Sequence, residues 1–199
     1  MGRKVLLSTG LVDEVPLLKG IEKLYGKSVH HCPYCDGFEQ LAVYGVGDKD
    51  SNLALMMKQW SADVVLLTDG PSQISPKIEA RLQRHQIPMC SEQIAALEGT
   101  DDGALQFIRL RGGKTLKRNA LFFTTSCRQA SELSASLGCV RDEKGGIVAD
   151  PVTEESSVPG VYVAGDASRD VLLVAVAIGE GAKAGVAIHR ALLQEDGLG

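Results

Sequence analysis

The sequence of 199 residues has no apolar run long enough to cross a lipid bilayer. Its beginning, MGRKVLLSTG, also lacks the long apolar core and the small-residue cleavage site of a secretory signal peptide. We therefore expect a soluble globular protein that is cytoplasmic and has no membrane partner.

A large excess of charge of one sign is missing as well. The sequence has 21 lysines and arginines and 25 aspartates and glutamates, which leaves a formal net charge of -4. One local basic cluster surrounds Gly112-Gly113, where a solvated hairpin explains it better than a nucleic-acid patch. Its members are Arg109, Arg111, Lys114, Lys117 and Arg118. We expect no nucleic-acid partner.

The cysteines do not have the pattern of a disulfide framework. There are five of them, an odd number, in a chain without a secretory signal. Cys90, Cys127 and Cys139 are isolated in apolar surroundings, which indicates buried packing residues. Cys32 and Cys35 are only three positions apart and therefore need a chemical explanation.

Short apolar runs that end in small or polar residues predict buried strands. They are Lys4 to Leu7, Leu41 to Tyr44, Val64 to Leu67, Leu121 to Thr124 and Val161 to Ala164. Helices are predicted between Gly47 and Trp60, from Pro76 to His85 and from Leu172 to Leu193. The alternation in ALQFIRLRGGKTLKRNALFF predicts a β-hairpin. Parallel strand-helix-strand units together with a meander indicate the α/β class.

A glycine-rich turn, YGVGDKD, separates the second predicted strand from its helix. Gly45 and Gly47 would let backbone N–H groups approach a dinucleotide pyrophosphate at the start of the helix. The third position of the GxGxxG pattern is Asp50, which crowds this turn and brings negative charge toward a phosphate. Asp69 closes the next strand, where an acid binds the ribose hydroxyls of NAD. Because no arginine pair follows that strand, NADH fits better than NADPH.

The Cys-x-x-Cys pair, Cys32 and Cys35, has the spacing that closes a small disulfide ring and lowers the pKa of one thiol. His30 and His31 are placed to assist a thiolate, and Asp36 is placed to carry the proton of thiol-disulfide exchange. Zinc is the competing interpretation, although no second Cys-x-x-Cys completes a tetrahedral site. We expect no metal.

Four stretches in this order, KVLLSTG, CPYCDG, GVGDKD and GVYVAGDAS, resemble the thioredoxin reductase-like flavoprotein disulfide reductases, a class of pyridine nucleotide-disulfide oxidoreductases. The resemblance covers essentially the whole chain. It implies an α/β fold in which a Rossmann-like three-layer nucleotide-binding domain is inserted into a partial FAD-binding domain. The expected domains are a partial FAD-domain segment at 1–29, an NAD(P)-binding-like domain with the CxxC at 30–146, and a C-terminal FAD-domain segment at 147–199.

The same resemblance implies an enzyme that passes electrons from NADH or NADPH through FAD to the Cys32-Cys35 disulfide. The electrons then go to a thioredoxin-like protein or a small disulfide. By this resemblance Cys32 attacks the substrate disulfide, Cys35 faces the flavin, and Asp36 is the acid/base. Gly165 and Asp166, in the GVYVAGDAS stretch, would contact FAD.

The family's opening strand and GxGxxG turn, which hold FAD, have no counterpart in this sequence. Half of a doubly wound domain leaves apolar sheet and helix faces uncovered. We therefore expect a homodimer, or pairing with a separate flavin-binding half. The alternative function is a truncated, non-catalytic nucleotide-domain module, or a subunit that is inactive without a partner chain.

Overall fold

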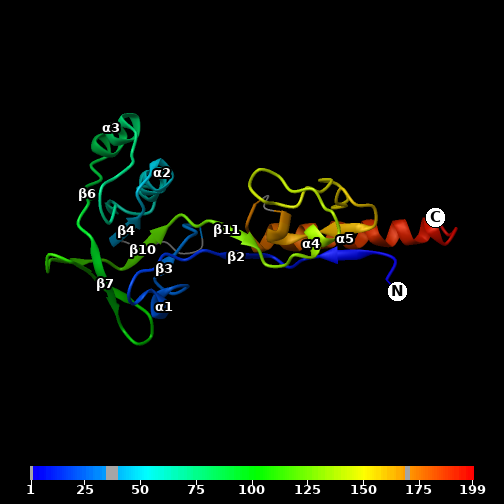
Figure 1. The fold of residues 1–199 in the computed structure, drawn as a ribbon, viewed down its shortest axis with the longest axis horizontal. Coiled ribbons are helices and arrows are strands. Elements are labelled where there is room, and N and C mark those ends of the chain that lie inside the picture. The colour runs from blue at the N-terminus through cyan, green and yellow to red at the C-terminus, as the bar shows by residue number, and fades with distance from the viewer. Residues whose placement is uncertain (1, 35–39, 169–170) are drawn as a thin grey trace. The chain divides into compact units, whose positions relative to one another are not determined.

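The computed structural model describes residues 2–34, 40–168 and 171–199. Their contacts divide the chain into two compact units (Figure 1). Unit 1 consists of Met1–Glu14 and Ser126–Gly199, and unit 2 is the inserted stretch Val15–Thr125. Unit 2 is thus inserted in the chain between the two segments of unit 1, and each unit has its own sheets and helices.

Unit 2 is built on a parallel sheet with the strand order β3-β10-β4-β5-β6 among the described residues. These strands are β3 (Val29–His30), β10 (Ala120–Phe123), β4 (Gln40–Tyr44), β5 (Asp63–Leu67) and β6 (Met89–Cys90). Parallel pairing of β4 with both β5 and β10 places β4 in the interior of the sheet. Such a strand is covered on both faces, which explains its continuous apolar sequence.

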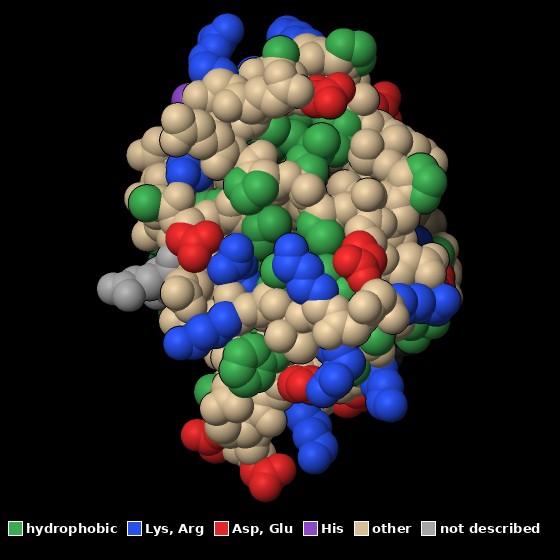
Figure 2. Space-filling view, turned by 90° about the vertical axis from the view of Figure 1, so that its left-hand side faces the viewer, with side chains coloured by type: hydrophobic (Ala, Val, Ile, Leu, Met, Phe, Trp, Pro, Cys, Tyr) green, Lys and Arg blue, Asp and Glu red, His purple; other side chains and the backbone are tan. Residues whose placement is uncertain are grey.

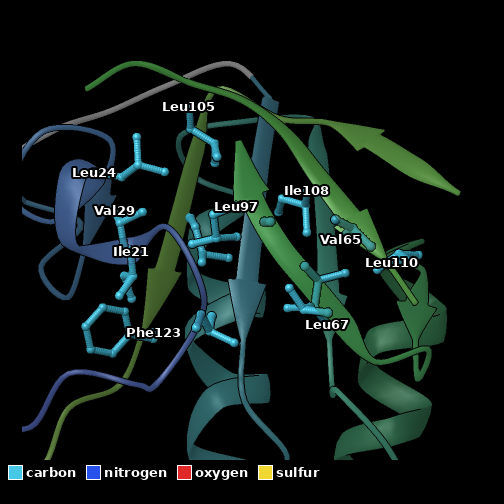
Figure 3. Close-up of a cluster of buried hydrophobic side chains, with 14 residues drawn as sticks. Ile21, Leu24, Val29, Val65, Leu67, Leu97, Leu105, Ile108, Leu110 and Phe123 are labelled. Carbon is cyan, nitrogen blue, oxygen red and sulfur yellow. The ribbon is translucent and has the colours of Figure 1, made fainter. Parts of the chain in front are cut away.

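Successive side chains of the sheet enter two different cores. Leu41 and Val43 point to the helices α2 (Asp48–Met57) and α3 (Pro76–Arg84), which cover one face. On the other face, Ala42 and Phe123 join a cluster with α1 (Ile21–Leu24) and with the antiparallel sheet β7-β8-β9. That sheet consists of β7 (Ile94–Gly99), β8 (Leu105–Leu110) and β9 (Thr115–Lys117). Figure 3 shows this second cluster between the sheets, and unit 2 therefore has three layers.

Unit 1 combines two short sheets with a long helix. In the described part of the chain, β1 (Val5–Leu7) pairs in parallel with β12 (Val161–Val163), and β2 (Leu11–Asp13) pairs antiparallel with β11 (Cys127–Gln129). The short helix α4 (Leu133–Ser136) follows β11. After β12 the chain forms the 3-10 turn η1 (Gly165–Ser168), and α5 (Val174–Glu195) ends the fold.

The structure confirms the predicted α/β class, and every strand and helix predicted above has a counterpart within a few residues. The borders of the compact units lie at 14/15 and 125/126, whereas the sequence suggested 29/30 and 146/147. Residues 15–29 belong with unit 2 because Leu18, Ile21 and Leu24 are buried in its core. The segment after Thr125 belongs with unit 1 because β11 pairs with β2.

The face of the molecule in Figure 2 shows basic side chains interspersed with acidic ones. Two members of the basic cluster near Gly112-Gly113 are in ion pairs. Arg109 lies 2.6 Å from Glu98, and Arg118 lies 3.2 Å from Asp63. Among the helices of the described residues, none combines the length and the apolar character needed to cross a membrane.

Candidate functional site

Cys32 lies two residues beyond the carboxyl end of β3, which is an edge strand of the parallel sheet in unit 2. Its side chain is partly exposed, while the next residue, Pro33, is buried. Cys35 and Asp36, the other two predicted catalytic residues, lie outside the described residues. The predicted nucleophile, Cys32, is therefore partly accessible to solvent.

The two histidines before Cys32 have different surroundings. His30 is buried in the sheet, with its ring centre 5.5 Å from that of Phe122. His31 is exposed, and its Nδ1 lies 3.1 Å from the hydroxyl oxygen of Tyr25. Of the two, only His31 is accessible to solvent, and His30 is packed inside the sheet.

Tyr34 contacts two residues at and just beyond the end of α2. Its ring packs edge-on against Trp60, with the ring centres 5.6 Å apart. Its hydroxyl points to the sulfur of Met56 at 4.0 Å. Although Tyr34 is 71% exposed, these contacts join the residue between the two cysteines to the helix that begins at the glycine turn. No pattern in the sequence indicated this contact.

The glycine turn is filled by a side chain of the protein itself. The carboxylate of Asp50 accepts a hydrogen bond from the backbone N–H of Gly47 at 3.2 Å, and its other oxygen accepts one from the Thr124 hydroxyl. Gly45 has a φ of +150°, and a Cβ added there would lie 2.0 Å from the carboxyl carbon of Asp50. Gly45 is therefore needed to make room for Asp50.

Asp69, the predicted ribose-binding acid, is held by contacts inside unit 2. Its Oδ1 accepts a hydrogen bond of 2.6 Å from the backbone N–H of Ile94, where β7 begins. Burial raises the pKa of Tyr44 at the end of β4, and the negative charges of Asp69 and Asp50 raise it further. Tyr44 therefore stays protonated to a higher pH than a free tyrosine.

The loop after Asp69 is bonded across the glycine turn. The N–H of Gln73 donates to the carbonyl of Val46 at 2.7 Å. The N–H of Ser75 donates to the Asp48 carboxylate, also at 2.7 Å. Hydrogen bonding from the Ser75 N–H, and from the Ser75 hydroxyl after it, lowers the pKa of Asp48. Asp48 was not among the predicted site residues, and its partner is 27 positions away in the sequence.

In unit 1, the predicted residues Gly165 and Asp166 begin the η1 turn beyond the end of β12. Gly165 has a φ of +74°, and its N–H donates to the Glu180 carboxylate of α5 at 2.6 Å. Glu180 is buried, whereas Asp166 is exposed. The turn is thus held in place from α5, and its acidic side chain remains accessible.

A cavity of about 530 Å³ lies beside this turn, at the carboxyl ends of β1 and β12. Leu6, Leu172 and Ala177 give it a mainly apolar lining, and Ser8 and Asp166 add polar groups. An apolar cavity with a few polar groups at the ends of parallel strands is typical of a cofactor site.

The predicted residues thus form separate groups within the two units. Gly45, Gly47 and Asp69 lie around the start of α2 in unit 2, and Gly165 and Asp166 lie at the cavity of unit 1. No cluster of three or more potential metal ligands occurs among the described residues, a set that does not include Cys35 and Asp36.

The comparisons with known proteins agree with this architecture. The sequence model of the family described as pyridine nucleotide-disulphide oxidoreductase matches residues 2–181. Thioredoxin reductase aclD of Aspergillus oryzae is 23% identical over 198 residues, with 94% of this chain and 63% of that protein covered. Thioredoxin reductase sirT of Leptosphaeria maculans is 27% identical over 216 residues, with 98% of this chain and 65% of that protein covered.

A solved structure is similar over nearly the whole chain. The putative thioredoxin reductase TrxB from Bacillus anthracis has a TM-score of 0.87 and 27% identity. The match covers 97% of this chain and 66% of that one. The chain spans 63% and 65% of the length of the two curated relatives, which is less than two thirds of each.

Proposed function

The chain belongs to the pyridine nucleotide-disulphide oxidoreductase family, and on that premise we propose that it performs thiol-disulfide exchange at Cys32 and Cys35. The proposed substrate is a thioredoxin-like protein or a small disulfide. The observation that supports this proposal is the partial exposure of Cys32 just after β3, two residues before Tyr34, which packs against Trp60.

The proposed exchange needs only the protein's own thiols. The Cys32 thiolate attacks one sulfur of the substrate disulfide, so that a mixed disulfide forms and the first substrate thiolate leaves. The Cys35 thiolate then attacks the Cys32 sulfur, which releases the second substrate thiolate and closes the Cys32-Cys35 disulfide. Asp36 is proposed to give a proton to a leaving thiolate. The substrate disulfide is thereby reduced, and the cysteine pair is oxidised.

Family membership implies FAD and NAD(P)H as cofactors. The residues of unit 1 fit part of a flavin, because the cavity joins apolar lining to the exposed carboxylate of Asp166. That carboxylate would accept hydrogen bonds from ribityl hydroxyls, and the η1 turn beginning at Gly165 would position it. When bound, a flavin supplies two-electron transfer to or from the cysteine pair.

The glycine turn of unit 2 does not fit the pyrophosphate of NAD(P)H, because Asp50 fills it. We therefore derive no step from a pyridine nucleotide in this chain. The same observation favours a second candidate function, a non-catalytic nucleotide-domain module. Calorimetry with NADH, NADPH and FAD separates the two, since such a module binds none of them, whereas the oxidoreductase binds FAD.

Unit 1 also supports a proposal about assembly. In the described part of the chain β1 and β12 form only a two-stranded sheet, and a sheet of this size is marginal without further cover. Val5, Val174 and Ile178 of the same unit are 41%, 78% and 68% exposed. We propose that a second copy or a separate flavin-binding half covers them, in the cytoplasm. A stable monomer in sedimentation velocity would contradict this.

The test of the exchange reaction is a trapping experiment with the fully reduced chain and an excess of thioredoxin disulfide or oxidised glutathione. A Cys35→Ser variant is expected to hold a mixed disulfide on Cys32, which mass spectrometry of peptides identifies. Cys32→Ser should form none at this segment, and Cys139→Ser is the matched control, because Cys139 is buried beside Ser156. Trapping that does not depend on Cys32 would refute the proposal.

A further inference from the structure

We infer that Asp50 is an internal anion that holds the position a dinucleotide pyrophosphate would need, and that it thereby excludes NADH and NADPH from unit 2. The inference concerns the nucleotide site alone. It goes beyond the proposed exchange at Cys32, which uses no nucleotide, and either can fail without the other.

The position of the Asp50 carboxylate is the first argument. In open α/β sheets, ligands bind beyond the carboxyl ends of the strands, at the point where neighbouring connections diverge. In unit 2 this point lies between β4, which continues into α2, and its neighbour β10. The Asp50 carboxylate bridges these two strand ends, since it accepts from Gly47 after β4 and from Thr124 after β10.

The available space is the second argument. A pyrophosphate can approach a glycine turn only if the surface over the glycine is open. At Gly45 the place of a Cβ is already taken, because the Cγ, Oδ2 and Cβ atoms of Asp50 lie 2.0, 2.3 and 2.5 Å from it. The close approach that the glycine permits is used by the protein's own carboxylate.

Hydrogen bonds around the turn are the third argument. The Gly47 N–H at the start of α2 is the kind of donor that binds phosphate at a helix N-terminus. It donates to Asp50 at 3.2 Å. The loop beyond β5 adds two bonds over the turn, from Gln73 to Val46 and from Ser75 to Asp48, each at 2.7 Å.

Charge is the fourth argument. A carboxylate and a pyrophosphate at contact distance repel each other, and α2 has a second acid, Asp48, in its first turn. The neighbouring cation does not compensate at the turn, because Lys49 donates to the carbonyl of Thr125 at 3.1 Å. Asp69, the predicted ribose acid, accepts from the N–H of Ile94. The groups expected to recognise the dinucleotide therefore serve the fold of unit 2.

Titration calorimetry of the full chain with NADH and with NADPH tests the inference. Asp50→Ala empties the turn and removes one negative charge, and we expect it to bind at least one nucleotide about tenfold or more tighter than the wild type. Asp48→Ala is the matched control. It removes the same charge from the same helical turn and one bond over the turn, but it leaves Asp50 over Gly45. Its affinity for either nucleotide should therefore rise far less than that of Asp50→Ala.

Asp50→Ser is the second variant, in case the alanine variant does not fold. Its hydroxyl can still accept from Gly47, while the bulk and charge of the carboxylate are gone, and the same gain is expected. Circular dichroism confirms that each variant is folded. The inference is overturned if the wild type binds either nucleotide with a Kd below about 10 μM, if neither Asp50 variant gains affinity, or if Asp48→Ala gains as much.

Discussion

Replacing Gly45 with alanine should strongly destabilise unit 2, and it should do so mainly through Asp50. The new methyl group would lie 2.0 Å from the carboxyl carbon of Asp50, at a φ of +150° that L side chains rarely adopt. The carboxylate would then have to leave the turn and give up its bonds to Gly47 and Thr124. The two residues are therefore predicted to be energetically coupled.

The size of the effect follows from these three contributions. The positive φ costs about 1 kcal/mol or more. The steric overlap, or the displacement that relieves it, costs about 1–3 kcal/mol. Hydrogen bonds to a charged group contribute about 1.5–3 kcal/mol when they are lost. We expect Gly45→Ala to lower the free energy of unfolding by about 3–5 kcal/mol, since these terms overlap in part. In an Asp50→Ala background the same change should cost only about 1–2 kcal/mol.

Urea unfolding of the full chain measures both values. Trp60 is the single tryptophan and packs against the core next to α2, so its fluorescence reports on unit 2. The matched control is Gly70→Ala, because Gly70 has a φ of +136° and no described atom within 4 Å of its added Cβ. It should show the backbone cost alone. A coupling energy between positions 45 and 50 below about 0.5 kcal/mol would refute the proposed contact.

Three further predictions concern Tyr34, Asp48 and Tyr44. Tyr34→Ala should speed the alkylation of reduced Cys32 severalfold, because residue 34 loses its contacts with Trp60 and Met56. Tyr34→Phe keeps the ring contact and should keep the wild-type rate; equal rates for the two variants would contradict this prediction. The folded-state pKa of Asp48 is lowered from 3.8, so the stability that ionised Asp48 adds to the fold is present above that pH and is lost as the pH falls through the lower value. Asp48→Asn should therefore weaken the acid dependence of urea unfolding below about pH 4. The pKa of Tyr44 is raised above 10.0, so its stabilisation is present below that pH and declines as the pH rises beyond it, and Tyr44→Phe should flatten this alkaline decline; an unchanged pH profile would contradict either assignment.

The elements that were predicted most closely are those whose burial is continuous along the chain. Strands β4 and β5 are apolar on both faces, and the buried residues of α2 and α3 recur with helical spacing. The pairing of β2 with β11 was not predicted, because each strand has only three residues. The paired residues, such as Asp13 and Cys127, are also far apart in the sequence. The borders of the compact units follow from this pair, so they too could not be placed in advance.

For the candidate site, the sequence showed which residues conflict with a nucleotide but not where their side chains point. From its place at the third position of the glycine pattern, Asp50 was predicted to crowd the turn. Its inward orientation depends on Thr124, which is 74 positions away. In the same way, Asp69 accepts its hydrogen bond from Ile94, which is 25 positions away in the sequence. Short-range patterns identify the residues, and long-range bonds decide what they do.

Because β2 pairs with β11, the inserted unit begins and ends at neighbouring points of unit 1. The N–H of Glu14 donates to the carbonyl of Ser126 at 2.9 Å, so the chain leaves unit 1 and returns to it at adjacent points. Val15, the first residue of unit 2, directly follows Glu14, and Thr125, its last residue, directly precedes Ser126. An insertion with neighbouring ends can be excised or exchanged while the parent strands stay paired. Loss or replacement of a nucleotide-type domain would therefore leave the fold of unit 1 continuous across a short joint.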